Sequence, residues 1–480
     1  MKVTFYILVF YCFVSCSEKK SNASTLSYGL EKTFLKDKNT TNPLIKGIWK
    51  SIGNGYYLEA RQDSILLYSY TTNFCYKEKN DYIEGLLHSQ SQFALRGDTL
   101  GIYLTDFGDK TQTLQTKKDF IKVDRLPENT IDFSKLTTLS PQKLFKLYIE
   151  TLQENYAFSK RRGLDWKSLF NGYKDSLTHT NEALFNTMGK IATLTKDQHT
   201  KKVISESGKT LQYRITPSAE VVKEAFKKQS EIKNLNEYFG LFFETNYKNI
   251  SDSLLHGNGI KVLNDKLEWG DLTKHIGYIN IHSFTGFLNR EHTRKQQIDS
   301  LNVHMQKIIN TFQDKEAIVI DISFNFGGYD ATALTIASYF TDATVFSHKS
   351  QVYDNGMFYD EDDVFIFPAN SLTFKKPVYV LMTDISRSAA ESFAVMMGVL
   401  PNVKLVGTNT LGTLSSMLGK SIGDFYTTYS NQRLVDESDQ FFEVYGVEPD
   451  IKLQVFKKEN IFQSHKTSVR DLIQIIEETH

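Results

Sequence analysis

Residues 378–400 have the sequence VYVLMTDISRSAAESFAVMMGVL and contain the two elements that decide the fold. The apolar run 378–382 predicts a buried strand, and the apolar spacing that follows predicts a helix over 388–400. Ser388 therefore falls at a helix N-terminus beyond the end of a strand, where catalytic groups gather in α/β sheets. Free N–H groups and the helix dipole favour negative charge there. Serine is also a preferred N-cap residue, and this segment taken alone favours the capping role.

The same alternation of strand and helix continues on both sides of this segment. Further strands are predicted over 278–281, 317–322 and 403–406, and further helices over 290–312 and 330–340. Because buried apolar strands alternate with amphipathic helices, we predict an α/β layer with parallel strands over 276–480.

Helical spacing dominates the region before this layer. It predicts a helix from Pro141 and two more over 165–176 and 181–194, which form a helical segment spanning 135–215. Residues 216–275 have a helical pattern as well and are predicted to be a connecting helical region.

Residues 41–125 have a different pattern, with short β-rich runs separated by turns such as Gly53-Asn54-Gly55 and Arg96-Gly97-Asp98. We predict a separate small all-β domain, a barrel or a sandwich, that buries a core of its own. A role of this domain in binding glycan or lipid stays open.

The composition excludes several classes of function. The chain has 480 residues, 56 of them basic and 56 acidic, so it lacks the basic excess of a nucleic-acid-binding protein. Its three cysteines cannot build a disulfide framework, and Cys75 is predicted to be a small buried hydrophobe. Motifs for zinc or phosphate binding are missing, so we predict neither a metal nor another cofactor.

The N-terminus has the pattern of a targeting segment. Lys2 precedes an apolar run that is too short to span a bilayer comfortably, and Ser15-Cys16 follows it. The junction resembles a bacterial lipobox, which implies a lipoprotein signal peptide over 1–15, a lipid on Cys16 and a polar tether over 16–40. We therefore expect a lipid-anchored, periplasm-facing protein of the cell envelope, with the membrane left open. The alternative is an ordinary signal peptide.

Two further loops carry candidate chemistry. A Gly327-Gly328 turn follows the predicted strand 317–322, and such a pair lets backbone N–H groups point into a pocket, although a tight turn alone would explain it. His199 lies in the sequence Asp197-Gln198-His199-Thr200, and histidine is the side chain best suited to take a proton near neutral pH. A surface histidine in a loop is the simpler interpretation of that segment alone.

Taken together, these motifs resemble the C-terminal-processing, or tail-specific, serine peptidase family from about Leu139 onward. The motifs that carry the resemblance are, in chain order, Asp197-x-His199-Thr200, Ile276-Gly277-Tyr278-Ile279, Asp321-x-x-x-Asn325-x-Gly327-Gly328, Ser388-Ala389-Ala390-Glu391 and Gly446-Val447-Glu448-Pro449-Asp450-Ile451. The resemblance implies a ClpP/crotonase-like α/β core that hydrolyses unfolded or C-terminal peptide segments through an acyl-enzyme. It leaves a homo-oligomer open.

Two branches of that family differ in the residue that acts as the catalytic base. Thr413 stands where one branch has its catalytic lysine, and Lys420 is predicted to be a solvated charge. Residues 200–275 lack the glycine-rich loop of a PDZ module. The chain therefore resembles the PDZ-less Ser–His branch, with the tricorn core and interphotoreceptor retinoid-binding protein. That resemblance implies His199 as the base and Glu443 as its support, with Glu448 as the nearby alternative.

The expected chemistry agrees with these assignments. A neutral histidine makes Ser388 nucleophilic. We assign the oxyanion donors to the N–H of Ala389 and an N–H of the Gly327-Gly328 turn. Gln198, Ser323 and Phe326 differ from the family pattern, and these positions concern the shape of the substrate pocket. The alternative function is a weak or inactive scaffold that binds apolar ligands or peptides, but the combination of serine, histidine and paired glycines favours the enzyme.

Overall fold

The computed structural model describes residues 33–37, 40–79, 92–104, 116–175, 177, 180–200, 216–289 and 291–479. The predicted signal peptide, the lipid site at Cys16 and most of the tether lie outside these residues. Within the described part of the chain, no helix is both long and apolar enough to cross a membrane.

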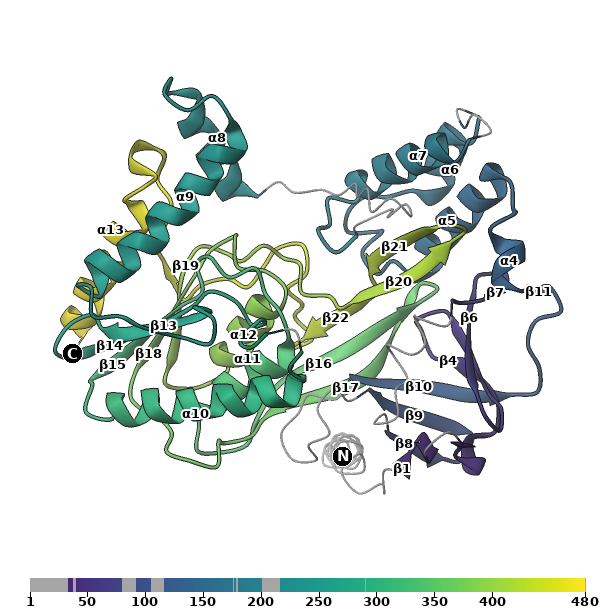
Figure 1. The fold of residues 1–480 in the computed structure, drawn as a ribbon, viewed down its shortest axis with the longest axis horizontal. Coiled ribbons are helices and arrows are strands. Elements are labelled where there is room, and N and C mark those ends of the chain that lie inside the picture. Colours follow the sequence, from purple (N-terminus) through teal and green to yellow (C-terminus); the bar gives the residue numbers. More distant parts are fainter. Residues whose placement is uncertain are drawn as a thin grey trace, which may run out of the picture.

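A seven-stranded sheet forms the centre of the larger lobe (Figure 1), in the order β12-β13-β14-β15-β18-β19-β23. Its strands are β12 (Ile260–Val262), β13 (Leu267–Asp271), β14 (Ile276–Ile281), β15 (Ala317–Asp321), β18 (Val378–Met382), β19 (Val403–Gly407) and β23 (Ile451–Lys452). The strands from β14 to β23 run parallel, as predicted, whereas β12 and β13 pair antiparallel. In the predicted connecting helical region 216–275, helices therefore occupy the first part, and β12 and β13 in its last part extend the sheet.

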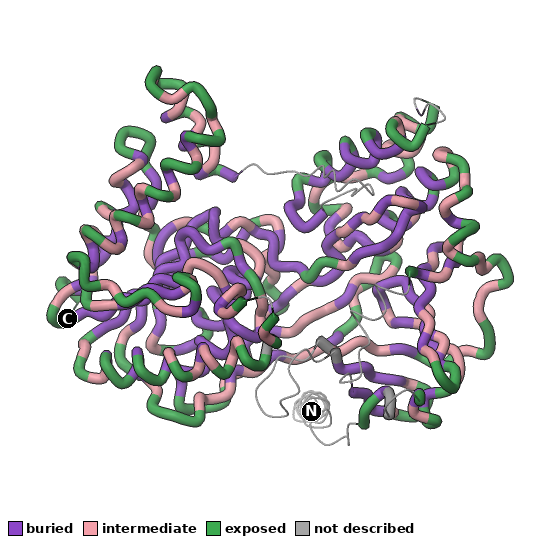
Figure 2. The backbone as a smooth tube through the Cα atoms, viewed as in Figure 1, coloured by how far each residue is buried: buried purple, intermediate pink, exposed green. Residues whose placement is uncertain are grey.

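Helices cover both faces of this sheet (Figure 1). One face packs on α10 (Arg294–Phe312), α11 (Asp330–Ala337) and α12 (Ala389–Gly398), and the other on α8 (Pro217–Lys227), α9 (Leu235–Asn249) and α13 (Ser464–Thr479). Along β15, Ile318 and Ile320 join the first core, and Ala317 and Val319 join the second. Both faces are apolar, so the central strands are buried along their whole length (Figure 2).

The helical segment forms a second lobe together with a hairpin from the C-terminal half of the chain (Figure 1). It contains α5 (Pro141–Asn155), α6 (Trp166–Tyr173) and α7 (Asn181–Leu194), which share an apolar core with the hairpin of β20 (Met417–Ile422) and β21 (Phe425–Ser430). Side chains of Ser140, Asp165 and Thr180 cap the three helices. These caps explain why the predicted helices begin close to where the sequence pattern placed them.

The N-terminal part forms a nine-stranded sheet in the order β1-β8-β9-β10-β4-β5-β6-β7-β11. Its strands are β1 (Thr33–Phe34), β4 (Gly47–Ser51), β5 (Tyr56–Ala60), β6 (Ile65–Tyr70), β7 (Cys75–Lys77), β8 (Gln92–Arg96), β9 (Thr99–Leu104), β10 (Thr116–Val123) and β11 (Thr130–Ile131). The sheet therefore extends beyond the predicted bounds 41–125 at both ends. It has an apolar cluster of its own, in which Leu418 of β20 takes part, and Cys75 is buried.

The remaining elements connect these parts. They are β2 (Lys36–Asp37), β3 (Thr40–Thr41), η1 (Pro43–Ile45), α4 (Phe133–Leu136), η2 (Ile250–Leu254), η3 (Ser338–Phe340), β16 (Val345–Asp354), β17 (Met357–Ile366), β22 (Gln432–Val435) and η4 (Lys458–Asn460). The long strands β16 and β17 pair with each other, and β22 pairs with β16. This three-stranded sheet lies between the two lobes (Figure 1).

Lys420 lies where the N-terminal sheet meets the β20–β21 hairpin, and the prediction of a solvated charge there is wrong. Its side chain is completely buried, donates to the carbonyl of Gly55 and lies over the ring of Tyr56, 4.5 Å from the centroid. Burial lowers the pKa of Lys420 to about 7. Tyr56 Oη also donates to the carbonyl of Gly419 at 2.5 Å. The N-terminal sheet thus covers polar groups of the hairpin that would otherwise be solvated.

Candidate active site

Ser388 lies between the end of β18 and the first residue of α12, as predicted. Its φ is 57° and its ψ is −127°, a conformation that residues with a Cβ rarely adopt. The Ser388 N–H lies 3.1 Å from a carboxylate oxygen of Glu391 and 3.2 Å from the carbonyl oxygen of Thr413. These contacts hold a strained backbone in place, as in the strand-to-helix turns that expose nucleophilic serines.

The predicted Gly327-Gly328 turn packs directly against the sharp strand-to-helix turn at Ser388, the nucleophile elbow. A Cβ on Gly327 would lie 2.8 Å from Ser388 Cβ and 3.0 Å from the backbone nitrogen of Ala389. A Cβ on Gly328 would lie 2.4 Å from the carbonyl carbon of Phe284. Both positions require glycine because the chain segments approach so closely.

The backbone N–H groups of this turn differ in their availability. The Gly327 N–H donates to Asn325 Oδ1 at 2.7 Å, so it is already used. Within the described residues, neither the Gly328 N–H nor the Ala389 N–H has an acceptor. Of the three predicted oxyanion donors, the N–H groups of Gly328 and Ala389 are therefore the ones available to a substrate. Gly327 contributes by its missing Cβ, which lets the turn approach Ser388.

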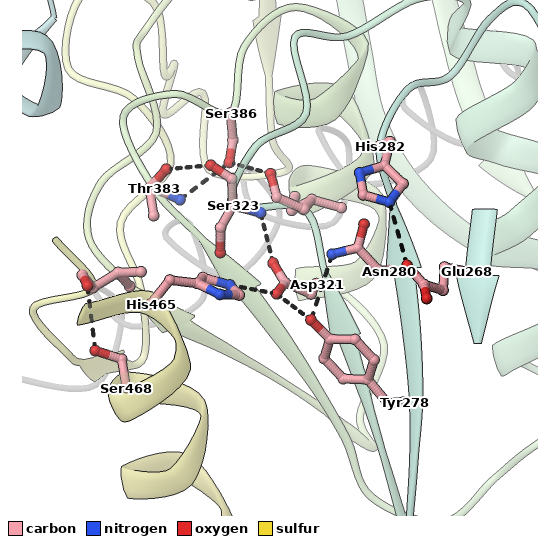
Figure 3. Close-up of polar contacts among 12 residues, drawn as sticks. Glu268, Tyr278, Asn280, His282, Asp321, Ser323, Thr383, Ser386, His465 and Ser468 are labelled. Atoms are coloured by element: carbon pink, nitrogen blue, oxygen red, sulfur yellow. Dashed lines mark hydrogen bonds and ion pairs between the residues drawn. The ribbon is translucent and has the colours of Figure 1, made fainter. Parts of the chain in front are cut away.

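A buried polar network surrounds Asp321, in the strand that leads to the glycine turn (Figure 3). Asp321, at the end of β15, accepts from the backbone N–H of Ser323 at 2.8 Å, and its other oxygen lies 2.7 Å from Nε2 of His465 in α13. Burial raises the pKa of Asp321, but the charge and hydrogen bond of His465 outweigh it, so the net shift is downward. The hydroxyls of Thr383 and Ser386, in the loop before Ser388, donate to the carbonyls of Ser323 and Ile322, which ties the two loops together.

His199 comes from the loop that follows α7. It is buried, so the simpler interpretation of a surface histidine is wrong. The backbone N–H of His199 donates to Asp197 Oδ1 at 2.8 Å, and its backbone carbonyl accepts from Thr428 Oγ1 of β21 at 3.0 Å. Burial raises the pKa of Asp197, whereas the nearby charges of Arg162 and His199 lower it, and the net shift is downward. An ionised Asp197 therefore accompanies His199 in the helical lobe.

The loops that carry His199 and Ser388 meet through their neighbours in sequence. Arg387 Nη1 donates to Gln198 Oε1 at 2.5 Å. A cavity of about 460 Å³ opens beside this contact, between the helical lobe and the core. Its lining includes Arg162, Lys196, Gln198, Asp384, Thr413 and Tyr445.

Glu443 is the buried member of the two candidate supporting carboxylates. Its Oε2 accepts from the N–H groups of Leu414 and Ser415 at 2.7 and 2.9 Å. Burial, with Asp197 and Glu391 nearby, raises the pKa of Glu443 well above its usual range. Glu448 is exposed and pairs with Lys452 at 2.9 Å, so it does not belong to the site. The Asp197 carboxylate, by contrast, binds the backbone N–H of His199 rather than its imidazole.

Glu391 has a role that the sequence analysis did not assign. It accepts from Thr410 Oγ1 at 2.6 Å and from the N–H groups of Gly412 and Thr413 at 2.6 and 2.8 Å, besides Ser388. Burial raises its pKa to about 7. The spacing Ser388-x-x-Glu391 is a capping-box signal that could have indicated this contact. His465 had no such signal, because its partner lies on a distant strand.

The described residues contain no group of three or more histidine, cysteine or acidic side chains that could hold a metal ion.

Comparison with known proteins agrees with this arrangement. Residues 275–453 match the family described as peptidase family S41. The chain carries an S41 peptidase domain. It is a serine peptidase, and the matched range contains Ser388, the Gly327-Gly328 turn and Glu443 but not His199.

Solved structures resemble the chain over most of their own length. A structure described as that of a putative peptidase from Parabacteroides merdae ATCC 43184 has 22% identity and a TM-score of 0.54, and the match covers 70% of this chain and 97% of that one. Mature CPAF complexed with lactacystin has 14% identity and a TM-score of 0.47, covering 71% and 98%. The photosystem II D1 C-terminal processing protease has 15% identity and a TM-score of 0.39, covering 68% and 97%. The first of these supports a shared mixed α/β fold.

Proposed function

We propose that this S41 peptidase is a tail-specific endopeptidase that cleaves unfolded or C-terminal peptide segments through an acyl-enzyme. Ser388 Oγ attacks the scissile carbonyl carbon and passes its proton to His199. The protonated His199 then gives that proton to the leaving amine as the C–N bond breaks. Water, activated by His199, releases the acyl group from Ser388. The N–H groups of Gly328 and Ala389 stabilise the oxyanion in both steps.

The observation that carries this proposal is the strained backbone of Ser388 against the glycine turn. A serine that only capped the helix would not require a φ of 57°. It would also not require Gly327 as a neighbour, whose missing Cβ leaves room for Ser388. This geometry leaves Ser388 half-buried beside two N–H groups without acceptors among the described residues.

The support for His199 comes from two carboxylates in different protonation states. Asp197 is the ionised one, and the hydrogen bond that it accepts from the His199 backbone orders the loop. Glu443, whose pKa is raised, is proposed to be the neutral partner that completes this buried cluster. The remaining sequence expectations stay part of the proposal: a lipid on Cys16 and a location in the cell envelope, facing the periplasm.

Labelling with a fluorophosphonate probe tests the nucleophile. The unmodified chain should label at one serine, and Ser388→Ala should abolish the label without altering the unfolding transition. Ser416, an exposed serine in the loop after Thr413, gives the matched control, because Ser416→Ala should label normally. Labelling that persists in Ser388→Ala would refute the proposed nucleophile. His199→Ala should lower the labelling rate on the order of a thousandfold.

A further inference from the structure

Three segments of the proposed site meet at the side chain of Arg387, the residue before Ser388. Its Nη1 donates to Gln198, the residue before His199, at 2.5 Å. Its guanidinium carbon lies 4.5 Å from the ring centroid of Phe326, the residue before the glycine turn. The contact therefore joins the immediate neighbours of the nucleophile, the base and the oxyanion turn.

Gln198 contacts Arg387 through its amide oxygen and Phe326 contacts it through the face of its ring, so each contact depends on a side chain that glycine or alanine would not supply. The Phe326 ring is 45% exposed, and it touches Phe243 of α9, with centroids 5.6 Å apart.

Two hydrogen bonds of the His199 loop reach different parts of the molecule. Thr428, whose hydroxyl binds the His199 carbonyl, belongs to the β20–β21 hairpin of that lobe. The Arg387–Gln198 hydrogen bond instead crosses from the loop to the nucleophile elbow. A planar guanidinium can stack on a ring and donate in its own plane at the same time, which an ammonium group cannot do.

We propose that Arg387 is a positioning residue that holds the His199 loop against the Ser388 elbow. This inference rests on the proposed function, since it requires His199 to act on Ser388. Substitution of Arg387 keeps every reacting group in the chain, but it frees the His199 loop to move relative to Ser388. Catalysis is sensitive to displacements of about 1 Å. The effect should appear in the acylation rate more than in substrate binding.

The test compares Arg387→Ala, Arg387→Lys, Gln198→Ala and the Arg387→Ala/Gln198→Ala double variant. Second-order rates of fluorophosphonate labelling, kcat and KM on an unfolded polypeptide, and urea unfolding midpoints are measured for each. We expect labelling and kcat to fall roughly tenfold or more in each single variant, with KM and the midpoint near those of the unmodified chain. The double variant should be no slower than Arg387→Ala, because both changes remove one contact.

Arg433 provides a matched control. It is also partly buried, lies 4.0 Å from the ring centroid of Phe358 and donates to Gln351 at 2.7 Å, but it does so between β22, β16 and β17. Arg433→Ala loses the same kinds of contact and should label normally. Normal labelling of Arg387→Ala, or independent effects that multiply in the double variant, would overturn the inference. An unmodified chain that does not label at all would overturn the proposed function and the inference with it.

Discussion

Substitution of Gly327 by alanine tests the close approach of the glycine turn to the nucleophile. The new Cβ would lie 2.6 Å from the carbonyl oxygen of Arg387 and 2.8 Å from Ser388 Cβ, and both distances are shorter than real Cβ contacts. The turn and the elbow must therefore separate by several tenths of an ångström. At a φ of 93°, the alanine also has a backbone strain of about 1–2 kcal/mol.

The two effects of this substitution can be separated with Gly356→Ala. Gly356 has a φ of 101° and no heavy atom within 4 Å of an added Cβ, so it has the strain without the clash. Both variants should lose stability in urea unfolding, and Gly327→Ala should lose more because it adds the clash to the strain. Only Gly327→Ala should lose activity, on the order of a hundredfold in the fluorophosphonate labelling rate, because the N–H donors move away from the oxygen that gains negative charge.

Two results would refute this reasoning. An unchanged labelling rate in Gly327→Ala would mean that the turn is not part of the site. An equal loss of labelling in Gly356→Ala would mean that backbone strain anywhere in the chain disables the enzyme. The labelled residue is identified by mass spectrometry in each case.

Three further predictions concern Lys420 and the N-terminal sheet. Lys420→Met should keep peptidase activity, because His199 rather than a lysine is the proposed base; loss of labelling in a folded Lys420→Met would contradict that. The folded chain releases the Lys420 proton near pH 7 and the unfolded chain near pH 10.5, so the free energy of unfolding should rise with pH between these values. An equal pH dependence in Lys420→Met, followed by urea midpoints, would remove Lys420 as the cause. Deletion of residues 17–130 uncovers Lys420 and the hairpin, so we expect the remaining chain to lose its cooperative melting transition; a sharp transition would show instead that the N-terminal sheet is an independent domain.

The central strands and the main helices could be predicted because their sequence pattern has one explanation. The strands 317–322 and 378–382 are apolar on both faces, which fits only a strand covered by helices on each side. Helix α7 begins and ends at the predicted residues, since Thr180 supplies its cap. Ser388 and the glycine turn were predictable for the same reason, because each follows such a strand.

The long strands β16 and β17 were missed because they carry charged side chains along much of their length. Lys349 and Asp360, for example, pair across the two strands at 3.0 Å, and many of their neighbours are partly exposed. Such strands lack the strict alternation of apolar and polar residues that predicts a half-buried sheet. The sequence pattern therefore left this region without an assigned element.

Contacts between distant parts of the chain account for the errors at single residues. Lys420 is buried by Gly55 and Tyr56, and His465 binds Asp321, and no local pattern links either pair. The choice of a donor within the Gly327-Gly328 pair could not be made from the sequence either. Which N–H of a glycine pair is free depends on the side chain of Asn325, and the sequence does not show where that amide points.

The division of the site between two lobes has a consequence for the newly made chain. The sheet carries Ser388 and the glycine turn, whereas the helical lobe carries His199. Under the proposed mechanism, a molecule whose core has folded before that lobe docks holds a nucleophile without a base. Such an intermediate still exposes extended segments, the kind of chain that the finished enzyme is proposed to cut. Neighbouring molecules in the same state also lack a positioned base, so under this mechanism they could not cut it before their lobes dock.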